Sequence, residues 1–63
     1  MTRTEFTASY MREADGYAVQ VTHKPTRDTA RFWTAGKRSE AQKEADRLID
    51  KWIAQGRNPN ARS

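Results

Sequence analysis

The stretch SEAQKEADRLIDKWIAQ, residues 39–55, decides the fold because it has the pattern of one amphipathic helix. Its apolar residues recur in steps of one, three and four, which gathers them into one stripe of an α-helix but on no face of a strand. The stripe consists of Ala41, Ala45, Leu48, Ile49, Trp52 and Ile53. Ser39 and Gln42 have the spacing of a capping box at the helix start, and Gly56 marks its end. This helix must therefore cover an apolar surface.

Three segments before the helix alternate apolar and polar residues, which predicts strands over about 4–11, 17–23 and 30–35. Asp15-Gly16 predicts a hairpin turn, since glycine accepts positive φ. Pro25 interrupts pairing before the third strand. Short loops favour antiparallel neighbours. The predicted fold is α+β: a three-stranded antiparallel β-meander with one C-terminal amphipathic helix packed on one face. It forms a single domain over 1–63, with a flexible tail at 57–63.

Strand alternation divides the predicted sheet into a core face and an open face. The core face carries Phe6, Ala8, Tyr10, Tyr17, Val19, Val21 and Phe32. The open face carries Thr7, Ser9, Met11, Ala18, Gln20, Thr22, Arg31 and Trp33. A bulge in the third strand would reverse its faces, burying Trp33 and exposing Phe32, so both arrangements stay open at this point.

The chain has 63 residues, no cysteine and a net charge of +4. The positive charge is concentrated in residues 24–38, which hold five basic residues and one acidic residue. Such a cluster fits a polyanion or an acidic protein surface. The lack of cysteine and of a long apolar run favours a cytoplasmic protein with no membrane contact.

The sequence contains few residues in arrangements suited to catalysis. His23 is the only histidine, and no acidic pair has a spacing suited to metal binding or general acid–base work. The three glycines are isolated, so no phosphate loop is present. We expect a protein that is not an enzyme and that needs no metal and no cofactor, with His23 as a surface or packing residue.

An open sheet face beside a basic cluster predicts a nucleic-acid-binding module, for DNA or RNA. The candidate binding residues are Gln20, Thr22, Lys24, Arg27, Arg31, Trp33, Lys37 and Arg38. Loop cations would hold phosphates, while Arg31 and Trp33 contact a base edge or stack. A monomer offers few contacts, so a homodimer, a larger complex or a clamp from Arg57 and Arg62 could add more.

Gly16-Tyr17, Phe32-Trp33-Thr34, and the helix residues Ala41 and Ala45 form a pattern that resembles a known family. It is the three-stranded-sheet DNA-binding domain of AP2 proteins and of the arm-binding domain of tyrosine recombinases. The resemblance covers about residues 5–55. It implies that the open sheet face enters the major groove, with contacts from Gln20, Thr22, Arg31 and Trp33.

The alternative interpretation is that this protein is an inhibitor that binds another protein. In size and style the chain is similar to phage-encoded proteins of the anti-CRISPR kind, which block host defence complexes. The basic cluster would then dock on an acidic or nucleic-acid-binding protein complex, with Trp33, Met11 and Tyr10 as anchors. Both readings use the same surface, but only the first predicts a steep dependence of affinity on salt.

Overall fold

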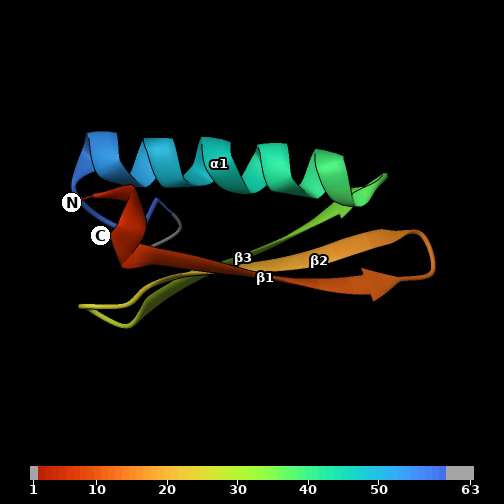
Figure 1. The fold of residues 1–63 in the computed structure, drawn as a ribbon, viewed down its shortest axis with the longest axis horizontal. Helices are drawn as coiled ribbons and strands as arrows, with labels where there is room; N and C mark the ends of the chain where they lie inside the picture. Colours follow the sequence, from red (N-terminus) through yellow and green to blue (C-terminus); the bar gives the residue numbers. More distant parts are fainter. Residues whose placement is uncertain (1, 60–63) are drawn as a thin grey trace.

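A computed structural model describes residues 2–59 and shows a three-stranded sheet with one helix along one face (Figure 1). The elements are η1 (Arg3–Glu5), β1 (Phe6–Glu13), β2 (Gly16–His23), β3 (Asp28–Ala35) and α1 (Arg38–Gln55). The sheet order is β1-β2-β3, and both pairs are antiparallel. The predicted βββα fold is therefore confirmed. Compared with the sequence-based ranges, β1 runs two residues further at its end and β3 begins two residues earlier.

The strand registers place the predicted core and open faces on opposite sides of the sheet. Tyr10, Val19 and Phe32 form one cross-strand row on the helix side, and Met11, Ala18 and Trp33 form the next row on the open side. Phe32 is half-buried against the core, whereas Trp33 is 52% exposed. Strand β3 thus contains no bulge that reverses its faces, which resolves the alternative left open by the sequence.

The core lies between α1 and the strands. Its buried apolar residues are Phe6, Val19, Val21, Ala30, Ala41, Ala45, Ile49 and Trp52. Trp52 is completely buried, and its ring meets the Phe6 ring edge-on, with 5.0 Å between the centroids. The predicted residues Ala8, Tyr10, Tyr17, Phe32, Leu48 and Ile53 are only partly buried and surround this centre. The real core is consequently smaller than the predicted one.

Two buried polar residues also join the core. The sequence left His23 as a surface or packing residue, and the structure buries it beside Phe6 and Trp52. Its Nδ1 lies 2.8 Å from the Thr26 hydroxyl, and its Nε2 lies 3.5 Å from a Glu5 carboxylate oxygen. Asn58, at the start of the predicted flexible tail, is buried as well. Residues 60–63 of that tail, including Arg62, lie outside the described residues.

The start of α1 differs from the prediction. The helix begins at Arg38 with Lys37 as its N-cap, and no side chain caps it. Ser39 therefore lies inside the first turn, and the predicted box with Gln42 is wrong, because the Lys37 carbonyl oxygen accepts from the amides of Glu40 and Ala41. The predicted stop is confirmed: Gly56 adopts the left-handed conformation, with φ of 70°.

Gly16 is needed for a reason other than the predicted one. The turn between β1 and β2 consists of Ala14 and Asp15, and Gly16 is already paired in the sheet. Among the described glycines only Gly36 and Gly56 have positive φ. A Cβ atom on Gly16 would lie 2.1 Å from the main-chain oxygen of Thr34. Close approach of β3, rather than turn geometry, therefore requires glycine here.

Helix α1 packs mainly over β1 and β2, so β3 forms an edge that the helix leaves largely uncovered. Arg3 of η1 fixes the other side of the helix through ion pairs with Asp46, at 2.9 Å, and Asp50. No helix among residues 2–59 is long and apolar enough to cross a membrane. This placement leaves the open sheet face and the outer edge of β3 largely uncovered by the helix.

Candidate nucleic-acid interface

Four consecutive cross-strand rows lie on the open side of the sheet; the fourth, Glu13-Gly16-Ala35, adjoins the β1–β2 turn and carries one carboxylate. The other three rows hold the candidate binding side chains. From the β2–β3 loop toward the β1–β2 turn, the rows are Thr7-Thr22-Thr29, Ser9-Gln20-Arg31 and Met11-Ala18-Trp33. None of these nine positions is acidic, and Arg31 carries their one charge. These three rows therefore form a hydroxyl- and amide-rich surface with one cation and one large aromatic ring. An open depression of about 570 Å³ crosses the second and third rows.

Arg31 is held in place by its neighbour across the strand pair. Its Nε donates to the side-chain oxygen of Gln20 at 3.1 Å. The two terminal guanidinium nitrogens make no other hydrogen bond within residues 2–59, so they remain available to a ligand. A guanidinium fixed at Nε presents a planar fork that suits a phosphate or the acceptor edge of guanine.

The next row supplies hydroxyl groups. The Oγ1 atoms of Thr22 and Thr29 lie 3.4 Å apart across β2 and β3. Sequence reasoning missed Thr29, because it placed the strand start at residue 30. The β-propensity of threonine was a signal for the longer strand. Hydroxyl groups both donate and accept, so this row suits contacts to phosphate and sugar oxygens.

Large apolar side chains lie exposed in the third row. Met11 is 67% exposed and Trp33 is 52% exposed. They lie on either side of Ala18 on the central strand β2. Because Ala18 is small, the Trp33 ring is accessible from the open side of the sheet. An accessible indole ring provides a stacking platform for a base.

The predicted loop cations divide between the two ends of the sheet. Lys24 and Arg27 are exposed in the β2–β3 loop, just beyond the threonine row. Arg27 has φ of 63°, and its amide donates to the His23 carbonyl oxygen at 2.7 Å, which closes the loop. Lys37 lies at the other end of β3, roughly 25 Å away for a strand of this length.

Lys37 and Arg38 do not join the open face. They border a hollow that also includes Glu13 and Asp15 of the first hairpin, so nearby carboxylates offset their charge. The Arg38 guanidinium lies 5.5 Å from the centroid of the Tyr10 ring, on the helix side of the sheet. Burial raises the pKa of the Tyr10 phenol, and Asp46 adds to this, whereas Arg38 opposes it. Of the eight predicted binding residues, six therefore lie on the open face or in its adjoining loop.

Among residues 2–59, no three side chains of His, Cys, Asp or Glu converge in a way that could hold a metal ion. Comparison with protein-family models, with curated proteins and with solved structures finds no match to this chain.

Proposed function

We propose that this protein is a non-enzymatic module that binds nucleic acid through the open face of its sheet. The observation that carries the proposal is a nine-residue part of the open face without an acidic side chain, on which Gln20 holds Arg31 and Trp33 lies exposed. Nucleic acids offer phosphates, base edges and π-faces, and this surface has a group suited to each.

Each group has a distinct role in the proposal. Lys24 and Arg27 contact phosphates from the loop and contribute affinity independent of base sequence. Arg31 contacts a base edge or a phosphate, and Trp33 stacks on a base or packs against the groove wall. The resemblance to the AP2-type sheet domain supports duplex DNA as the first ligand to test, with the open face in the major groove.

The test is a titration of labelled duplex DNA at two salt concentrations, with single-stranded DNA and RNA measured alongside. Binding should weaken steeply with salt, and Lys24→Ala should reduce the salt slope by about one. Arg31→Ala should cost about 1–3 kcal/mol. Lys43→Ala is the matched control, because it removes the same charge from an exposed helix position. Absence of binding at low salt, or equal weakening by the control, would overturn the proposal.

A further inference from the structure

In β3, the main-chain N–H and C=O groups of every second residue point away from β2 and are not used by the sheet. The amide of Lys24 donates to the Glu5 carbonyl oxygen at 2.9 Å, which extends the β1–β2 register by one pair. Hydrogen-bonded and non-bonded pairs alternate along an antiparallel ladder, so the odd residues of β2 bond to the even residues of β3. The outward groups of β3 are consequently those of Thr29, Arg31, Trp33 and Ala35.

At one end of this edge, an outward main-chain group is already hydrogen-bonded by the chain itself. The Asn58 side-chain amide donates to the Thr29 carbonyl oxygen at 2.8 Å, which independently confirms the outward direction. The main-chain groups of Arg31, Trp33 and Ala35 make no such bond within residues 2–59. A free edge of this length is long enough to pair with a short extended segment.

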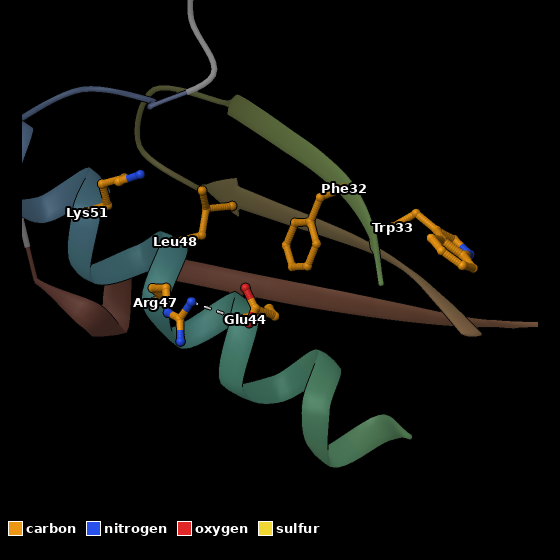
Figure 2. A pocket seen from close by; sticks show the side chains of 6 residues that line it. All are labelled: Phe32, Trp33, Glu44, Arg47, Leu48 and Lys51. Atoms are coloured by element: carbon orange, nitrogen blue, oxygen red, sulfur yellow. Dashed lines mark ion pairs between the residues drawn. The ribbon is translucent and has the colours of Figure 1, made fainter. Parts of the chain in front are cut away.

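A groove of about 340 Å³ runs beside this edge, between β3 and α1 (Figure 2). The Phe32 ring points from β3 toward α1 and the Leu48 side chain points from α1 toward the sheet, while Trp33 points away from the groove. Both Phe32 and Leu48 are half-buried, so the groove offers partly exposed apolar surface.

The helix side of the groove holds two bases and one acid, Arg47, Lys51 and Glu44, so its net charge is positive. Arg47 and Lys51 line it, and Arg47 has only a loose ion pair, at 3.6 Å, with Glu44. Lys51 makes no ion pair within the described part of the chain. Helix α1 starts next to the end of β3 and runs back along it (Figure 1), so residues late in α1, such as Lys51, lie toward the start of β3.

We propose that this groove binds an extended acidic segment of a partner protein, which adds to β3 as a fourth antiparallel strand. The residue opposite Phe32 points to the helix side and packs its apolar side chain on Phe32 and Leu48. Two residues later in the segment, the side chain opposite Ala30 lies on the same side, below Lys51, and is a carboxylate. The intervening residue exchanges main-chain hydrogen bonds with Arg31.

A second copy of this chain fits the same edge less well. Strand β3 of another copy is DTARFWTA, and in a symmetric pairing about Phe32 it would place Thr34 rather than an acid opposite Ala30. Each copy carries a net charge of +4, so two copies also repel. Charge complementarity therefore selects an acidic partner. This inference concerns a different ligand and uses the main-chain groups of β3, whereas the proposed nucleic-acid surface uses the side chains of Arg31 and Trp33.

The test uses a fluorescent eight-residue peptide of alternating Thr and Val, with one Leu followed two residues later by Asp. Binding to the full chain is measured by fluorescence polarisation. One peptide is N-methylated at the residue between Leu and Asp, whose N–H faces β3. The matched peptide is N-methylated at Leu, whose N–H faces away. The first modification should weaken binding about tenfold or more, and the second should leave it nearly unchanged.

Protein variants test the helix side of the groove. Lys51→Glu should weaken peptide binding about fivefold, whereas Lys43→Glu, with the same charge change at an exposed position outside the groove, should not. The bound peptide should also slow hydrogen exchange at the amides of Arg31, Trp33 and Ala35. Equal effects of the two N-methylations, equal effects of the two lysine variants, or no binding would overturn the proposal. Self-association in ultracentrifugation that protects these amides without peptide would overturn it in favour of a second copy.

Discussion

Asn58 and Thr29 join the end of the chain to the outer edge of the sheet, through a side-chain amide that donates to a main-chain oxygen 2.8 Å away. The bond spans 29 residues of sequence and includes a buried asparagine just after the helix stop. It holds Asn58 against β3 and satisfies an outward-facing carbonyl group of the sheet edge.

Replacing Asn58 should therefore destabilise the fold even though the residue follows the last helix. Asn58→Ala removes one donor and should lower the free energy of unfolding by about 1 kcal/mol in a urea titration. Gln55→Ala is the control, since this side chain is exposed at the helix end. An equal loss of unfolding free energy in Asn58→Ala and Gln55→Ala would contradict a specific role for the Asn58 hydrogen bond.

The two tryptophans should respond oppositely to truncation. Trp52→Ala removes a completely buried ring and should cost about 3–5 kcal/mol, enough to unfold most of so small a domain at room temperature. Trp33→Ala changes a half-exposed side chain and should shift stability by about 0.5 kcal/mol or less. Thermal melts followed by circular dichroism compare them. A cooperative melt of Trp52→Ala at the parent temperature would refute the core described above.

Intrinsic fluorescence separates the two rings. Trp33 is exposed on the open face, so acrylamide should quench it strongly, whereas Trp52 should be protected. If nucleic acid stacks on Trp33, its addition should quench the parent protein but leave the Trp33→Phe variant, which retains only Trp52, unchanged. Quenching that persists in this variant would place the contact elsewhere.

Glu5 should make stability sensitive to acid. The main-chain amide of Thr2 donates to its carboxylate at 2.9 Å and holds the Glu5 pKa below its ordinary value, with His23 helping and partial desolvation opposing. A lowered folded-state pKa stabilises the fold above the ordinary pKa, and this contribution disappears as the pH falls through the folded-state pKa.

Glu5→Gln should therefore destabilise the protein at pH 7 and converge with the parent in strong acid. Urea titrations at neutral pH and near pH 3 measure the difference between the two proteins. Glu13→Gln makes the same chemical change at an exposed residue of the hairpin. If the free energies of unfolding of the parent and of Glu5→Gln differ by the same amount at all pH values, the pH dependence does not come from this carboxylate.

Gly16 should tolerate no side chain. The Cβ atom of Gly16→Ala would lie 2.1 Å from the Thr34 oxygen and 2.9 Å from the Ala35 Cα, both main-chain atoms that cannot rotate away. Separating β2 from β3 should cost about 1–3 kcal/mol, measured by denaturant titration. Ala14→Ser in the neighbouring turn is the control, since Ala14 is exposed. A fully stable Gly16→Ala protein would show that β3 can shift at no cost.

The sequence was sufficient to predict what depends on local periodicity. The spacing of Ala41 to Ile53 identified the helix, and strand alternation assigned Phe32 to the core side and Trp33 to the open side. It also placed Gln20 and Arg31 on one face, because residues that alternate along neighbouring strands share a side. These properties follow from the geometry of single elements, so no long-range contact was needed to find them.

Only the tertiary structure decided how far the helix reaches across the sheet and which charges share a surface. Lys37 and Arg38 lie close to Arg31 in sequence, yet the extended strand carries them to the far end, beside Glu13 and Asp15. The burial of Asn58 and the uncovered edge of β3 depend on where α1 packs. That choice comes from contacts between residues distant in the sequence, and these contacts leave no periodic signal in the chain itself.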